Sequence, residues 1–288
     1  MAEDPQNAQA PVSAQEPDPQ EEELQEEELQ EGESQESEAQ EQGVMPLVEH
    51  LKELRKRLLI SVCAFAVSSA AAYVFADGIY GFLSAPLRDL MGEDGRMIYT
   101  ALTEVFFTHL KVALFGGLVI AFPVIASQMW FFIAPGLYQN ERRAFLPFLL
   151  ASPALFILGT AVAYYLVIPL AWRFFLSFEG PSTMGGLPIE LEAKVGEYLG
   201  LVMKLIIAFG LSFQVPVALM LLVKAGLLSC RALKRYRKYA IVIAFVMAAV
   251  LTPPDLISQV MLATPIILLY ELSVILAFLV ERKRREEK

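Results

Sequence analysis

The sequence predicts an all-α membrane protein with six transmembrane helices and both chain ends in the cytoplasm. Of the 288 residues, 56% are hydrophobic and only 19% are charged, and the mean hydropathy is +0.49, which is too apolar for a soluble domain. Six apolar segments approach or exceed the length of about 20 residues that crosses a bilayer. Basic residues cluster before the first segment, at every second connection and after the last segment.

The first 43 residues are an acidic tail of different composition. They hold 15 of the 32 Asp and Glu and none of the 23 Lys and Arg, so residues 44–288 carry a net charge of +6. So polar a segment cannot bury enough apolar surface to offset its ordering entropy. We therefore expect a disordered cytoplasmic tail before a membrane domain at residues 44–288, with transient capture of basic partners as the functional alternative. No basic and apolar leader opens the chain, so we expect no cleavable signal peptide.

Six segments are candidate spans: residues 58–76, 112–134, 144–170, 198–223, 239–252 and 256–280. The fifth is short, and the sixth is interrupted by Glu271. Joined through Pro253-Pro254-Asp255, these two should form a tight hairpin, with local bilayer thinning as one way to accommodate the mismatch. Prolines that bend or break helices favour a curved, non-parallel bundle. These are Pro123, Pro147, Pro153, Pro169, Pro216 and Pro265.

Orientation follows from the basic residues, because cytoplasmic loops carry an excess of Lys and Arg. Four clusters hold 17 of the 23, and only six spans with both ends cytoplasmic keep all four clusters inside. The opposite side then carries two loops, residues 77–111 and 177–197, and the Pro-Pro-Asp turn.

The sequence lacks the motifs of membrane and soluble hydrolases and of nucleotide binding. It has no His-Glu-x-x-His, Gly-x-Ser-x-Gly or Gly-x-x-x-x-Gly-Lys, and its two histidines and two cysteines are too few and too scattered for a metal site or a disulfide framework. We therefore expect a binding or transport role, without catalysis, metal or cofactor.

Carboxylates on the cytoplasmic side are candidates for ligand binding. Glu53 precedes the first span, where it is either an i, i+4 partner of Arg57 in a basic anchor or a group that accepts a cationic ligand. Glu141, between spans two and three, is either a solvated charge or the second member of a carboxylate pair. A guanidinium meets a carboxylate in a bidentate geometry that Lys cannot reproduce, so the pair would suit two adjacent arginines.

Two polar residues interrupt later spans. Gln214 in span four and Glu271 in span six need polar partners inside the bilayer. For Gln214, a hydrogen bond between helices and a role in docking a partner protein are equally favoured.

Taken together, these residues resemble TatC, the multispanning receptor of the twin-arginine protein translocase, along essentially all of residues 47–288. The matching blocks are His50-Leu51-x-Glu53-Leu54-Arg55-x-Arg57-Leu58, Ser84-Ala85-Pro86-Leu87, Phe106-Phe107-Thr108 with Lys111, Gln128-x-Trp130-x-Phe132-Ile133-Ala134-Pro135-Gly136-Leu137-Tyr138-x-x-Glu141-Arg142-Arg143, Phe209-Gly210-x-Ser212-Phe213-x-x-Pro216, Leu251-Thr252-Pro253-Pro254-Asp255, and Gln259-x-x-Leu262-Ala263-x-Pro265 with Tyr270-Glu271.

The resemblance implies a glove-shaped receptor that binds the twin-arginine signal peptides of folded cargo on its cytoplasmic face. Glu53 and Glu141 match the positions that recognise the arginine pair. Further matching positions act in signal binding or complex function: Arg55, Phe132, Pro86, Asp255, Gln214 and Glu271.

The resemblance also implies partners and energetics. The single-span subunits TatA and TatB would dock along spans five and six and near Gln214, in an assembly of several copies in a bacterial inner membrane. Export would be driven by the proton-motive force, with no nucleotide or nucleic acid bound. Some relatives carry Glu where this chain has Gln214, and the acidic tail lies outside the family core.

Two other classes compete with this interpretation. A secondary transporter would need ligands at the bilayer midplane and usually inverted repeats, and the two three-span halves share no obvious motif. A membrane protease is a more distant alternative.

Overall fold

A computed structural model describes residues 47–92, 96–137, 142–178, 191–224, 226–251 and 256–286. The chain divides into Met1–His50 and Leu51–Lys288, and all packing described below lies within the second unit. The helices are α2 (Leu47–Val74), α3 (Ala76–Met91), α4 (Glu104–Leu137), α5 (Arg142–Val162), the π-helical segment η1 (Ala163–Val167), α6 (Ile168–Leu176), α7 (Val195–Ser212), α8 (Val215–Lys224), α9 (Cys230–Leu251) and α10 (Leu256–Glu286). Within the described ranges the only β-pairing is an isolated bridge, so the prediction of an all-α fold is confirmed.

Five stretches of helix are long and apolar enough to cross a bilayer: Val48–Val74, Glu104–Phe132, Pro147–Leu176, Val195–Lys224 and Gln259–Leu279. They correspond to five of the six predicted spans. The remaining one, residues 239–252, coincides with the apolar part of α9, whose first two turns are basic. The structure therefore has a helix at this sixth position, although its apolar part is short, as expected from the sequence.

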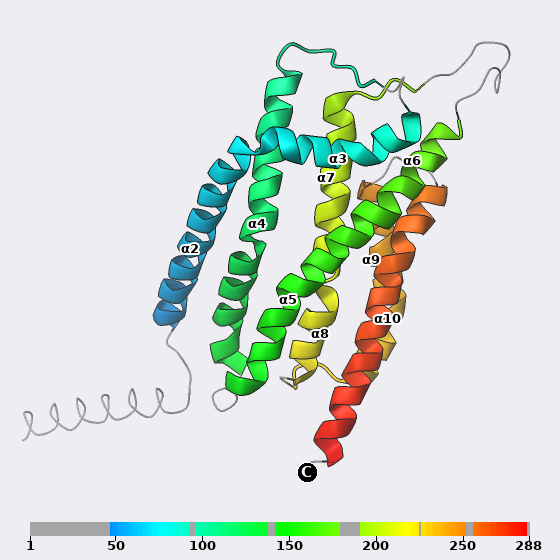
Figure 1. Ribbon diagram of the computed structural model, residues 1–288. Coiled ribbons are helices and arrows are strands. Elements are labelled where there is room, and N and C mark those ends of the chain that lie inside the picture. Colours follow the sequence, from blue (N-terminus) through cyan, green and yellow to red (C-terminus); the bar gives the residue numbers. More distant parts are fainter. Residues whose placement is uncertain are drawn as a thin grey trace, which may run out of the picture. The chain divides into compact units, whose positions relative to one another are not determined.

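The prediction that residues 77–111 form a loop is wrong. This segment contains α3, which lies across one end of α4 and α7 (Figure 1), and the first two turns of α4. Its glycines and Pro86 hid the helix, yet α3 has an apolar side on which Leu83 and Leu87 are buried. Similarly, the predicted loop at residues 177–197 ends where α7 begins, at Val195.

The core is built around α7. Leu199, Val202 and Phe209 are fully buried there, and α7 packs against both α4 and α5. Glycines permit the α5–α7 approach, because a Cβ at Gly159 would lie 2.7 Å from the Phe209 carbonyl oxygen. Small residues at crossings are the usual device for packing helices in lipid.

Prolines mark the breaks in two spans, as predicted. α7 ends at Ser212 and α8 begins at Val215, with Pro216 at the second position of the new helix, where its missing N–H costs nothing. Pro169 likewise sits in the first turn of α6, directly after η1. The C-terminal helix α10 then runs beside α8 and α9 (Figure 1).

Candidate functional site

Glu53 lies near the start of α2, and its two carboxylate oxygens have different surroundings. Oε1 accepts hydrogen bonds from Arg57 one turn later, at 3.1 Å from Nη2 and 3.4 Å from Nε. Oε2 is buried and has no hydrogen-bond partner within the described part of the chain. A buried polar atom without a partner costs about 1–3 kcal/mol, and a charged one costs more. The expected i, i+4 pair is confirmed, and half of the carboxylate is left available for a further donor.

Arg57 connects this carboxylate to the end of α4. Its Nη1 donates to Oε1 of Gln128 at 3.1 Å, and its guanidinium lies 5.4 Å from the centre of the Phe131 ring. The side chains of Arg57 and Glu53 are 29% and 18% exposed, so solvent screens their attraction only in part. The group of Glu53, Arg57, Gln128 and Phe131, called here the α2–α4 cluster, is a partly desolvated site already shaped around a guanidinium.

The structure places the other predicted signal-binding residues as follows. Phe132 follows Phe131 on α4 and is partly buried. Arg55 is exposed on α2, and because successive side chains of a helix turn by about 100° it lies on the side opposite Glu53. Glu141 lies outside the described residues, so its pairing with Glu53 stays a prediction.

Sequence reasoning missed the contribution of Arg57 to the site beyond its local pair. It named Gln128 only as part of a matching block, without a place in the site, and it did not name Phe131. Gln128 could have been found, because it is a polar side chain in an otherwise apolar span, the signal that singled out Gln214. Its partner could not, since the two residues are 71 positions apart.

Pro86 interrupts the hydrogen bonding of α3, one tyrosine compensates, and a second tyrosine binds the next carbonyl. A proline has no N–H for the carbonyl four residues earlier. That carbonyl, of Phe82, instead accepts the Tyr164 hydroxyl at 2.7 Å, and the two rings stack with centres 4.2 Å apart. The next carbonyl, of Leu83, accepts the Tyr198 hydroxyl at 2.9 Å. Pro86 thereby attaches α3 to η1 and α7.

Gln214 is buried in the turn between α7 and α8, where it pairs with one residue of α5. Its Oε1 accepts the Ser152 hydroxyl, and its Nε2 donates to the Ser152 carbonyl oxygen at 3.1 Å. The amide is therefore used in a hydrogen bond between helices, the first of the two alternatives raised by the sequence. A role in partner docking stays a prediction.

Glu271 of α10 forms an ion pair with Arg237 of α9, with 2.7 Å between Oε2 and Nη2. The two side chains are 36% and 45% exposed, so the pair lies at the surface of the α9–α10 hairpin. Asp255, predicted to act in the turn of that hairpin, lies outside the described residues.

On the side opposite the α2–α4 cluster, Glu104 joins two helix starts. Its Oε2 accepts the Thr100 N–H at 2.9 Å beside the first turn of α4, and its Oε1 accepts the Gly196 N–H of α7 at 3.1 Å. The Gly196 N–H is one of those that a helix leaves unpaired at its amino end, whereas the Thr100 N–H belongs to the segment that precedes α4. The neighbouring bridge between Ile98 and Lys194 joins the same two segments.

The described residues contain no group of three or more His, Cys, Asp or Glu side chains that could hold a metal ion.

Comparison with known proteins gives a consistent result. Residues 49–265 match the family model described as Sec-independent protein translocase protein (TatC). A protein of that name from Magnetococcus marinus is 55% identical over 84% of this chain and 88% of its own length, and one from Escherichia coli is 41% identical over 86% and 94%. A crystal structure described as the twin-arginine translocase receptor TatC superimposes with a TM-score of 0.72 at 42% identity, covering 81% of this chain and all of the other.

Proposed function

Because the chain belongs to the TatC family, and is thus a multi-pass receptor component of a bacterial protein translocase rather than an enzyme, we propose that it binds twin-arginine signal peptides at the α2–α4 cluster. The observation that carries the proposal is the buried Oε2 of Glu53, which has no hydrogen-bond partner among the residues that the structure describes. A guanidinium from the ligand would supply the missing donor, and a charge-assisted hydrogen bond is worth roughly twice a neutral one.

Arg57 supports this assignment, because the cluster already holds one guanidinium. It shows that Glu53, Gln128 and the Phe131 ring together accept this planar group through hydrogen bonds and a cation–π contact. A ligand arginine would either share Glu53 with Arg57 through Oε2 or displace Arg57 from Oε1. A lysine would provide only a point charge, which accounts for a preference for arginine.

Glu141 is proposed as the second carboxylate of the site. It follows the last residue of α4, Leu137, by four positions in the sequence, and α4 is the helix that carries Gln128 and Phe131. One carboxylate for each ligand arginine gives specificity, while the apolar part of the signal would gain affinity by lying along exposed apolar side chains of the bundle.

The wider assembly follows from the same proposal. We place both chain ends on the cytoplasmic side of a bacterial inner membrane, since the basic clusters favour that orientation. TatA and TatB would dock on α8 to α10, where Glu271 and Arg237 are surface residues, and several copies would assemble for export driven by the proton-motive force. Gln214 and Asp255 would act in that assembly. The acidic tail at residues 1–43 lies outside the described residues.

Site-specific photocrosslinking of a twin-arginine precursor to membranes containing the full chain tests the proposal. The variants are Glu53→Gln, Glu141→Gln and the double change. Glu49→Gln is the matched control, because it removes an exposed carboxylate one turn earlier on the same helix. We expect the double variant to lose its crosslinks and the control to keep them, and a twin-lysine precursor to crosslink poorly to the unchanged protein.

Undiminished crosslinking in the double variant would place arginine recognition elsewhere. Equal crosslinking of the twin-lysine and twin-arginine precursors would exclude a guanidinium-specific site.

A further inference from the structure

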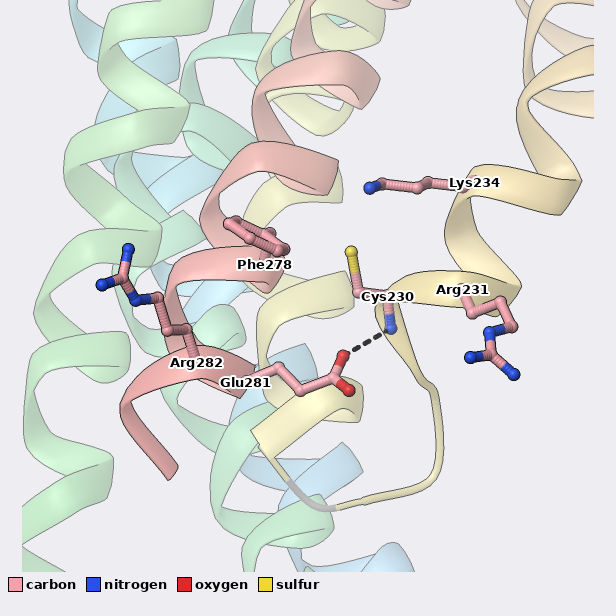
Figure 2. Close-up of a pocket in the computed structure, with 6 residues that line it drawn as sticks. All are labelled: Cys230, Arg231, Lys234, Phe278, Glu281 and Arg282. Atoms are coloured by element: carbon pink, nitrogen blue, oxygen red, sulfur yellow. Dashed lines mark hydrogen bonds between the residues drawn. The ribbon is translucent and has the colours of Figure 1, made fainter. Parts of the chain in front are cut away.

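A second pocket lies away from the α2–α4 cluster, between the first turn of α9 and the last turns of α10. Its volume is about 410 Å³, and Figure 2 shows its lining: Cys230, Arg231, Lys234, Phe278, Glu281 and Arg282. It is placed at the end of the apolar stretch Gln259–Leu279, the depth at which lipid headgroups meet a spanning helix. The proposed signal-peptide site makes no use of it.

The lining carries three cationic side chains and one carboxylate. That carboxylate is engaged: Oε2 of Glu281 accepts the backbone N–H of Cys230 at 3.0 Å, the bond drawn in Figure 2, and so caps the start of α9 from across the hairpin. Arg231 and Lys234 lie three residues apart on the same side of α9. The pocket is therefore rimmed by positive charge, with Lys234 reaching into it and the two arginines directed outward in Figure 2, and a contact between its two helices holds its shape.

One wall of the pocket is apolar and continues toward the bilayer. Phe278 is 49% exposed, and Ile275, one turn deeper on α10, is 56% exposed. The ammonium of Lys234 lies 5.4 Å from the centre of the Phe278 ring, so positive charge and apolar surface meet at one point. Figure 2 shows Lys234 reaching from α9 toward this ring.

We propose that the pocket binds an anionic phospholipid, with the headgroup phosphate beside Arg231 and Lys234 and an acyl chain along Phe278 and Ile275. Basic recesses between membrane helices are suited to such headgroups, and clustered cations on this face attract anionic lipid. Soluble phosphate would use the cations but would gain nothing from the apolar wall, which is why we assign the ligand as a lipid.

Native mass spectrometry of the full-length protein in detergent tests this assignment. The protein is titrated with phosphatidylglycerol, with phosphatidylcholine of the same acyl chains, and with glycerol 3-phosphate as the free headgroup. We expect phosphatidylglycerol to bind more tightly than either of the others. Removing both cations by Arg231→Gln and Lys234→Gln should weaken it by about 25-fold, from about fivefold for each charge near the surface.

The matched control is the double change Arg235→Gln and Lys238→Gln. It removes the same charge from the same helix at residues that do not line the pocket, and it should leave phosphatidylglycerol binding within about twofold of the unchanged protein. Equal losses in the two double variants would show a diffuse charge effect and overturn the site. Displacement of the lipid by glycerol 3-phosphate at equal concentration would show a free anion site instead of a lipid site.

A second measurement avoids changes to the pocket. The chain has two cysteines, so Cys63→Ser leaves Cys230, in the pocket lining, as its single thiol. Phosphatidylglycerol should slow alkylation of Cys230 by N-ethylmaleimide, and phosphatidylcholine should not. Equal alkylation rates with the two lipids would overturn the proposal.

Discussion

The contact between α2 and α4 depends on a glycine, and its removal is a quantitative test of the packing. A Cβ at Gly117 would lie 2.5 Å from Cα and 2.6 Å from the backbone nitrogen of Ser69. Ordinary contacts begin at 3.4 Å, so Gly117→Ala must push the two helices apart by about 1 Å, since neither backbone atom can rotate away. Overpacking against backbone atoms lowers the free energy of unfolding by about 3 kcal/mol, and the better helix propensity of alanine raises it by about 1 kcal/mol.

We therefore expect Gly117→Ala to lower the free energy of unfolding by about 2 kcal/mol. Thermal unfolding in detergent should show a midpoint lower by about 4–8 °C, at about 2–4 °C for each kcal/mol. Gly200→Ala is the matched control, because a Cβ there meets nothing within 4 Å and the same propensity gain applies. Equal midpoints for the two variants would refute the close crossing of α2 and α4.

Three further predictions concern single side chains. Arg57→Gln removes the guanidinium that competes with a ligand for Oε1 of Glu53. A twin-arginine peptide should therefore bind several-fold more tightly in a fluorescence titration. Weaker binding would mean that Arg57 helps to hold the peptide. Tyr164→Phe leaves the Phe82 carbonyl oxygen without a donor and should lower the free energy of unfolding by about 1–3 kcal/mol, measured by thermal unfolding. The loss should be smaller in a Pro86→Ala background, where the backbone N–H at position 86 can donate to that carbonyl. Gln214→Leu leaves its serine partner unpaired and should cost about 1–2 kcal/mol by the same measurement, whereas an unchanged midpoint would assign the amide to partner docking alone.

The spans were predictable because the bilayer allows few solutions. Every backbone group in lipid must be paired within the segment, so a long apolar run such as residues 112–134 can only be a helix. Breaks were predictable only as possibilities at six prolines: helices change at Pro169 and Pro216, whereas Pro123, Pro147, Pro153 and Pro265 lie inside continuous helices. The amphipathic α3 was lost because its 16 residues are too few to span a bilayer and its two glycines and Pro86 are typical of a loop.

The site was predictable only as a set of residue types. Glu53 was recognised because it is a carboxylate in a stretch of basic residues next to the membrane. Arg57 was found as its local partner because the helix fixes the i, i+4 geometry. The contacts to Gln128 and Phe131 depend on how α2 crosses α4, which the close approach at Gly117 determines. Likewise, nothing in the spacing of Pro86, Tyr164 and Tyr198 indicates that they meet.

The hydrogen bonds by which Glu104 joins the starts of α4 and α7 have a consequence for biosynthesis. Glu104 and Gly196 are 92 residues apart in the sequence. The Glu104 carboxylate therefore lacks its Gly196 partner for some time after the first turn of α4 has been synthesised. At a synthesis rate of about 5–20 residues per second, that interval is roughly 5–18 seconds. During it, the segment containing Ile98 also lacks its partner at Lys194. The end of the bundle that holds the start of α4 is therefore completed late, and a ribosome that stalls before Gly196 should leave α4 inserted but its start open to protease.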